Sequence, residues 1–169
     1  LEPPGAIGFL TDTPAATAAP LPGVATVVLD RLQDPGNVGT ILRSAAALGV
    51  RQVLTMKGSA ALWSPKVLRA GMGAHFALHL VEGLAIEQLD ALGDLPLVAT
   101  SSHAAQALHQ RVLPAPCAWV FGHEGQGVAP ALMARCQLTV RIPQPGGEES
   151  LNVAAATAIC LYESARQAL

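Results

Sequence analysis

The feature of this chain that most constrains its fold is the alternation of short β-branched runs with helical stretches. Five runs are predicted to form strands, at residues 25–29, 52–56, 97–100, 118–121 and 138–142. Helices are predicted over 38–48, with Gly49 just beyond the C-terminal end, and over 151–168. The segment 64–92 is predicted to hold a further helix and a further strand. This order predicts an α/β fold, with a mostly parallel sheet flanked by helices.

The composition agrees with a packed domain. Apolar residues make up 51% of the 169 residues and charged residues 13%, which suits helices packed on a buried sheet and excludes a disordered chain. The formal net charge is −2, whereas a free-standing nucleic-acid binder usually has a basic surplus. If the ligand is a nucleic acid, an attached domain or a dimer surface is expected to supply part of the affinity. No apolar run approaches the length of a membrane span, so no membrane association is expected.

Three cysteines, at positions 117, 136 and 160, are widely spaced and form no CxxC or Cys/His cluster. This pattern predicts no zinc site and favours a reducing cytoplasm over an oxidising compartment. Residues 1–23 are rich in Pro, Ala and Thr and are predicted to be a linker or lead-in to a single domain at 24–169.

Three loops that follow predicted strands carry the polar residues of interest, because ligands in parallel sheets bind at the carboxyl ends of the strands. In the first loop, Asp34-Pro-Gly-Asn37 precedes a helix, and Asn37 is predicted to be its N-cap. Arg43 falls away from the apolar face of that helix. The loop is either a capped helix with a surface arginine or an anion-handling Asn/Arg pair.

The second loop begins with Phe121-Gly-His-Glu124 and contains glycines at 122, 125 and 127. Glycine permits close backbone approach to a ligand, but this spacing matches neither a dinucleotide fingerprint nor a Walker A motif. Glu124 is expected to orient a ligand or to cap a turn. A plain strand–helix connection remains the alternative, and His123 is expected to be a solvent-facing turn residue.

The third loop runs from Ile142-Pro143 through Gly146 to Ser150-Leu151-Asn152. Ser150 is placed to cap the last helix. Asn152 is a poor choice inside a first helical turn unless its side chain has a hydrogen-bond partner.

Taken in order, the three loops resemble the three motifs of the SpoU/TrmH branch of the SPOUT RNA methyltransferases. The resemblance covers about residues 24–166, and it is the combination of all three motifs that makes it specific. It implies a deep trefoil knot in the C-terminal third, a homodimer, and S-adenosyl-L-methionine as methyl donor, with S-adenosyl-L-homocysteine as product and no metal. The residues that it places beside the cofactor are Thr100, Ser101, Phe121, Gly122, Gly125, Ile142, Gln144, Leu151 and Asn152.

The reaction implied is methylation of a ribose 2′-hydroxyl in RNA, with ribosomal RNA first and transfer RNA second. The resemblance makes Arg43 the catalytic arginine, and its helpers are Asn37, Glu124, Ser150 and Asn152. Gln144 and Ala154 depart from the methionine and serine that the family often has there. Relatives with this first motif often carry a small N-terminal RNA-binding domain, so a partner domain before residue 24 is expected.

Two other function classes are alternatives to an RNA methyltransferase. A non-catalytic knotted RNA-binding scaffold would be favoured by loss of Arg43 or of the glycine loop, and both are intact. A Rossmann-like nucleotide-binding enzyme needs a glycine fingerprint after the first strand, which Asp34-Pro-Gly-Asn37 does not supply.

Overall fold

The computed structural model describes residue 12, residues 18–147 and residues 151–169. In these ranges six strands form one sheet in the order β3-β2-β1-β5-β4-β6, and every pairing is parallel. The strands are β1 (Thr26–Asp30), β2 (Gln52–Met56), β3 (His79–Leu84), β4 (Leu97–Thr100), β5 (Ala118–Gly122) and β6 (Leu138–Val140). The predicted α/β class with a parallel sheet is therefore confirmed.

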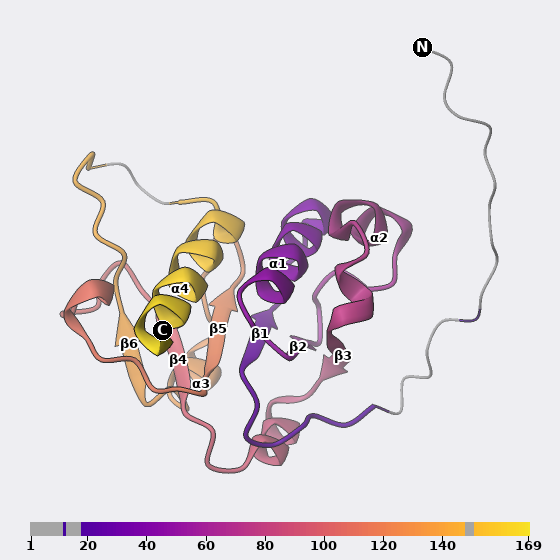
Figure 1. Cartoon of the computed structure of the whole chain (residues 1–169), viewed down its shortest axis with the longest axis horizontal. Coiled ribbons are helices and arrows are strands. Elements are labelled where there is room, and N and C mark those ends of the chain that lie inside the picture. Colours follow the sequence, from indigo (N-terminus) through magenta and orange to yellow (C-terminus); the bar gives the residue numbers. More distant parts are fainter. Residues whose placement is uncertain (1–11, 13–17, 148–150) are drawn as a thin grey trace.

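Helices cover both faces of the sheet (Figure 1). On one face α1 packs against both α2 and α4. The other face is covered by the short α3 and by the 3-10 helix η2. The bounds are α1 (Pro35–Ala47), α2 (Pro65–Gly71), α3 (Pro130–Met133) and α4 (Val153–Ala168), with 3-10 helices η1 (Ala74–Ala77), η2 (Ile86–Leu92) and η3 (Leu108–Gln110). No helix in the described ranges is long and apolar enough to cross a membrane.

Strand β1 lies at the centre and is buried along its whole length. Val27 and Leu29 pack into the core beneath α1 and α4, whereas Val28 packs into the core on the opposite face. Burial on both faces explains why this strand is a continuous apolar run rather than an alternating one.

The sheet reverses its winding between β1 and β5. The chain leaves β1 through α1 on one face, and it leaves β5 through α3 on the other. In open parallel sheets such a switch point opens a crevice at the carboxyl ends of the two strands. Here these ends are neighbours, because Asp30 pairs with Gly122.

The elements lie close to their predicted positions, with one correction that matters for function. The N-cap of α1 is Asp34, not Asn37: Oδ1 of Asp34 accepts a 2.7 Å hydrogen bond from the Asn37 backbone N–H. Pro35 opens the helix, a position where its missing N–H costs nothing. Asn37 therefore lies within the first turn, and its side chain is free for contacts beyond its own helix.

Candidate functional site

A cavity of about 670 Å³ lies at the carboxyl ends of β4, β5 and β6. Its volume is within the range of small-molecule sites. All nine residues predicted to contact a cofactor line this cavity: Thr100, Ser101, Phe121, Gly122, Gly125, Ile142, Gln144, Leu151 and Asn152. Residues from three separated stretches of the chain thus meet around one space.

A chain of polar contacts ties the three loops together beside this cavity. Glu124 Oε1 accepts hydrogen bonds of 3.3 Å from the Asn37 side-chain amide and from the Asp34 backbone N–H. Asn37 Oδ1 in turn accepts a 2.9 Å hydrogen bond from the side-chain amide of Asn152. One predicted residue from each motif therefore takes part in a single network, and Ser150 lies outside the described residues.

The same contacts set the charge of Glu124. Burial alone would raise the pKa of its carboxyl. Hydrogen bonds from its own backbone N–H, the Asn37 side chain and the backbone N–H groups of Asp34 and Gln33 outweigh that effect and hold the pKa below its ordinary value. Glu124 is therefore ionised at neutral pH and is an acceptor in this network, not a proton donor.

Asn152 has a second role that corrects the predicted cap. It is the N-cap of α4, and its Oδ1 accepts from the backbone N–H groups of Ala154 at 2.9 Å and Ala155 at 3.3 Å. The prediction that this amide needs a partner is confirmed, and the partners are two: its oxygen caps α4 while its nitrogen reaches Asn37.

The glycine-rich loop after β5 folds back tightly on itself. His123 and Gly127 exchange backbone hydrogen bonds of 3.1 and 2.8 Å. A Cβ on Gly122 would lie 2.1 Å from the Gly127 carbonyl carbon, so a side chain at 122 is incompatible with this turn. Gly127 has φ +69°, in the region that favours glycine.

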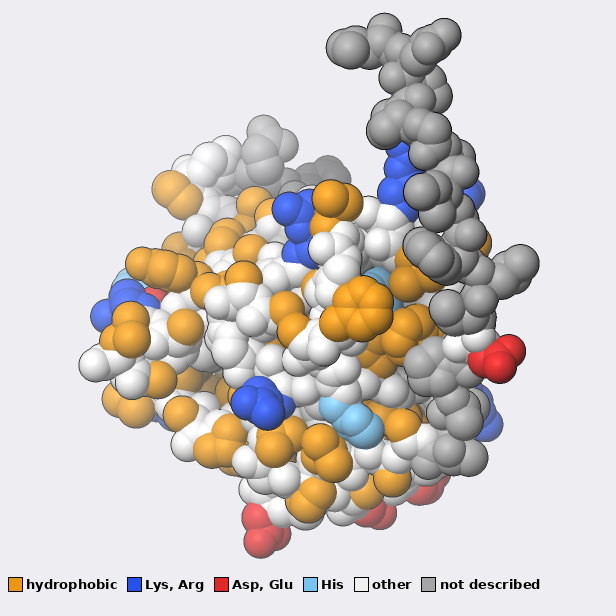
Figure 2. Space-filling view, turned by 45° about the vertical axis from the view of Figure 1, so that its right-hand side comes forward, with side chains coloured by type: hydrophobic (Ala, Val, Ile, Leu, Met, Phe, Trp, Pro, Cys, Tyr) orange, Lys and Arg blue, Asp and Glu red, His pale blue; other side chains and the backbone are white. Residues whose placement is uncertain are grey.

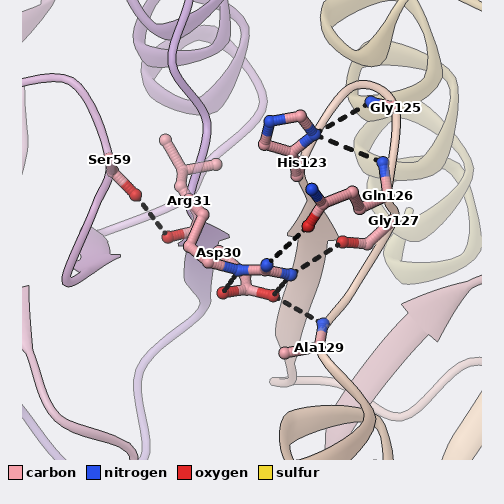
Figure 3. Close-up of polar contacts among 9 residues, drawn as sticks. Asp30, Arg31, Ser59, His123, Gly125, Gln126, Gly127 and Ala129 are labelled. Carbon is pink, nitrogen blue, oxygen red and sulfur yellow. Dashed lines mark hydrogen bonds and ion pairs between the residues drawn. The ribbon is translucent and has the colours of Figure 1, made fainter.

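His123 is not the solvent-facing residue that was expected. It is half-buried, and its Nδ1 accepts from the backbone N–H groups of Gly125 at 3.0 Å and Gln126 at 3.2 Å. The ring thus organises the loop from inside (Figure 3).

Sequence reasoning missed a second anchor of this loop, made by Asp30 and Arg31 at the end of β1 (Figure 3). Asp30 is 4% exposed, and its Oδ2 accepts a 2.6 Å hydrogen bond from the Ala129 backbone N–H. Arg31 pairs with Asp30 and also contacts Gln126 and Gly127. An acid directly after an apolar strand was the available signal, because a buried carboxylate requires partners.

Arg43 lies apart from the cavity. It is exposed on α1 and lines a neighbouring groove of about 550 Å³ together with Lys66 and Arg69 of α2. None of the ion pairs in the described ranges involves these three cations. Asp34 links the two spaces, since it lines the groove and its backbone N–H contacts Glu124 at the cavity.

The surface over α2 shows how these charges are spread. On the face that brings α2 and β3 forward, Lys and Arg side chains are scattered among apolar and other side chains, and several Asp and Glu side chains line the lower edge (Figure 2).

Neither thiolate nor metal chemistry is favoured by the described residues. Burial raises the pKa of Cys117 and of Cys136 to about 11 and also raises the pKa of Cys160. These thiols are thus protonated at neutral pH and are poor nucleophiles. Within the part of the chain that the structure describes, no three His, Cys, Asp or Glu residues group together as metal ligands.

Comparisons with known proteins converge on one family. Residues 25–162 match the model of the SpoU rRNA Methylase family. An uncharacterized tRNA/rRNA methyltransferase of Synechocystis is 38% identical over 99% of this chain and 62% of its own length. The 23S rRNA (guanosine-2′-O-)-methyltransferase of Bordetella pertussis is 38% identical over 83% of this chain and 59% of its own.

A solved structure has the same fold. The SpoU methyltransferase AviRb from Streptomyces viridochromogenes, in complex with the cofactor AdoMet, superposes with a TM-score of 0.80 at 32% identity, over 86% of this chain and 60% of that one. The chain therefore spans about three fifths of the length of these relatives.

Proposed function

Because the chain belongs to the SpoU rRNA methylase family, we propose that it transfers a methyl group from S-adenosylmethionine to a ribose 2′-hydroxyl in RNA. Ribosomal RNA is the first candidate substrate and transfer RNA the second, in line with the names of its relatives. The observation that carries the proposal is the Glu124–Asn37–Asn152 network, which joins all three motif loops beside the cavity.

The cavity suits a nucleoside-like cofactor. Its wall combines apolar side chains of Phe121, Ile142 and Leu151 with backbone groups exposed by the glycine loop. The absence of a side chain at Gly122 lets the returning loop pack directly against the end of β5. When bound, S-adenosylmethionine supplies a methyl group already activated by its sulfonium.

The RNA would lie in the groove of Arg43, next to the cavity. Arg43, Lys66 and Arg69 are suited to phosphates, and a guanidinium can hold a phosphate by two parallel hydrogen bonds. We assign Arg43 to the phosphate beside the target ribose, where its positive charge also stabilises the 2′-oxygen as the hydroxyl proton is lost to solvent water. Most of the rate enhancement is expected from aligning that hydroxyl with the methyl group.

We assign three residues to fixing the position of the groove relative to the cavity: Asn37, Glu124 and Asn152. Ser150 is assigned to the active centre beside them. We propose residues 24–169 as the catalytic unit. From the family resemblance we also propose a trefoil knot through the loops after β5 and β6, a homodimer and a cytoplasmic location.

The first experiment is isothermal titration of the chain with S-adenosylmethionine, beside Asn152→Ala and Arg43→Ala variants. We expect about one site per chain, weakened by Asn152→Ala and unchanged by Arg43→Ala. Methyl transfer from labelled donor to transcribed 23S rRNA and to tRNA, with 2′-O-methylated RNA as a blocked control, then tests the reaction. A folded chain that binds no S-adenosylmethionine would contradict the methyltransferase assignment and favour an RNA-binding scaffold.

A further inference from the structure

At the end of β1, Asp30 and Arg31 form an ion pair, and both side chains also hydrogen-bond to other residues. Asp30 is almost fully buried, and both of its oxygens are used: Oδ1 accepts from Arg31 Nε at 3.1 Å, and Oδ2 accepts from Arg31 Nη2 at 3.3 Å and from Ala129 N–H at 2.6 Å. This pairing fixes the plane of the guanidinium.

The remaining donors of that guanidinium cross to the glycine-rich loop. Arg31 Nη1 donates to Gln126 Oε1 at 2.9 Å, and Nη2 also donates to the Gly127 carbonyl at 3.3 Å. Gln126 and Gly127 both line the cavity, and Glu124 precedes Gln126 by two residues. Figure 3 shows the arginine lying between the end of β1 and this loop.

Arg31 has a backbone conformation that is unusual for a residue other than glycine. Its φ is +57°, a conformation that glycine adopts freely and that costs other residues roughly 1–2 kcal/mol. A non-glycine residue persists in such a conformation when surrounding contacts fix it, and these positions cluster at functional sites. The contacts of the side chain with Asp30, Gln126 and Gly127 are the ones that distinguish Arg31 from glycine here.

We infer that Arg31 is a positioning residue that holds the glycine-rich loop, residues 123–128, in the shape needed to form one wall of the cofactor cavity. The inference rests on the proposed function for the identity of the cofactor. Residues 122–127 contain three glycines, and glycine loses more conformational entropy on ordering than any other residue. His123 fixes the loop from within, and the Asp30–Arg31 pair fixes it from the neighbouring strand.

The test uses two substitutions of this arginine in the whole chain. Arg31→Gly removes the guanidinium while relieving the left-handed backbone, so the fold is expected to persist. Arg31→Lys keeps the charge but cannot contact Asp30, Gln126 and Gly127 together, because an ammonium lacks the planar fork. We expect the Kd for S-adenosylmethionine to rise about tenfold in Arg31→Gly and by a smaller factor in Arg31→Lys, each contact being a hydrogen bond to a charged group.

A second readout needs no ligand. Hydrogen exchange of the cofactor-free chain should show faster amide exchange over residues 123–128 in Arg31→Gly, with α1 and α4 unchanged. Arg135→Ala is the matched control, since the Arg135 side chain is 32% exposed against 33% for Arg31 and bonds Asp90 and the Ile86 carbonyl instead. It should leave both the Kd and the loop exchange as in wild type.

A Gln126→Ala variant tests whether Arg31 acts through its contact with the loop. If Arg31 acts through this loop, the effects of Arg31→Gly and Gln126→Ala on the Kd will be less than additive. Unchanged loop exchange and unchanged Kd in Arg31→Gly would overturn the inference and leave the proposed function intact. Failure of the wild-type chain to bind S-adenosylmethionine would overturn the proposed function, and the assignment of the loop as a cofactor wall with it.

Discussion

The side-chain amide of Asn152 donates a 2.9 Å hydrogen bond to Oδ1 of Asn37, a residue 115 positions earlier in the chain. Because the oxygen of Asn152 also caps α4, one side chain fixes the start of α4 and binds it to the first turn of α1. The orientation of Asn37 toward Glu124 follows from the same contact.

The two roles of Asn152 can be separated by substitution. Asn152→Ala should lower the free energy of unfolding by about 1 kcal/mol, as expected for a lost N-cap, and should weaken S-adenosylmethionine binding. Asn152→Ser keeps a capping oxygen but is too short to reach Asn37, so it should keep near-native stability and still bind the cofactor weakly. Urea denaturation and titration calorimetry measure the two effects. Wild-type cofactor affinity in Asn152→Ser would show that the Asn152–Asn37 contact has no part in binding.

Two glycines of the same loop should respond differently to alanine. At Gly122 a Cβ would lie 2.1 Å from backbone atoms of Gly127 and Val128, so Gly122→Ala must displace the loop. We expect a loss of about 1–3 kcal/mol of stability, typical of overpacking, and no measurable cofactor binding. At Gly125 the nearest atoms to a Cβ are 3.8 Å away in the His123 ring, an ordinary contact, so Gly125→Ala is the control for stability. Equal stabilities of the two variants would be inconsistent with the turn described above.

The lowered pKa of Glu124 gives a pH-dependent prediction. A carboxyl with a lower pKa in the folded chain stabilises the fold above its unfolded pKa of about 4.3, and this stabilisation is lost as pH falls through the folded pKa. Glu124→Gln keeps an oxygen that can accept from Asn37 but removes the charge. Its stability should therefore fall below that of wild type near pH 7, and the two should converge below the folded pKa. Urea midpoints across this range measure the difference, and a gap that did not change with pH would contradict the assignment.

The groove of α1 and α2 should govern RNA affinity without affecting the cofactor. In Lys66→Ala/Arg69→Ala, loss of two phosphate contacts should reduce the slope of log affinity against log salt by ~1.4 for single-stranded RNA. Filter binding to transcribed 23S rRNA at several salt concentrations measures the slope, and S-adenosylmethionine binding should be as in wild type. Replacing Lys57, which does not line the groove, by Ala is the control. A slope equal to that of wild type would place the RNA elsewhere on the surface.

Much of the architecture could be predicted from local patterns. The strand runs of β2 and β4 are predicted with the bounds that the structure gives, because both are short runs rich in β-branched and apolar residues. The three motif loops could be located for the same reason, as each directly follows such a strand. Gly49, with φ +82°, lies just beyond the C-cap of α1, the position at which a glycine is expected.

The contacts between the loops depended on tertiary structure. Asp34 and Asn37 both suit an N-cap, and Pro35 at the first helical position is a local signal for Asp34. The contact of the Asn37 side chain with Glu124, in contrast, depends on the approach of the second loop. The Arg31 bridge to Gln126 spans 95 residues, and no local pattern could reveal it.

The sequence by itself determined which residues form the strands, which loops follow them and which polar residues those loops carry. The tertiary structure decided which of these residues meet: it brings Asn37, Glu124 and Asn152 into one network and sets Arg43 in a separate groove. The physical reason is that strand formation follows from burial along a short segment. The partners of a buried or bridging polar group, in contrast, are set by the order of the strands in the sheet, which places the ends of β1 and β5 side by side.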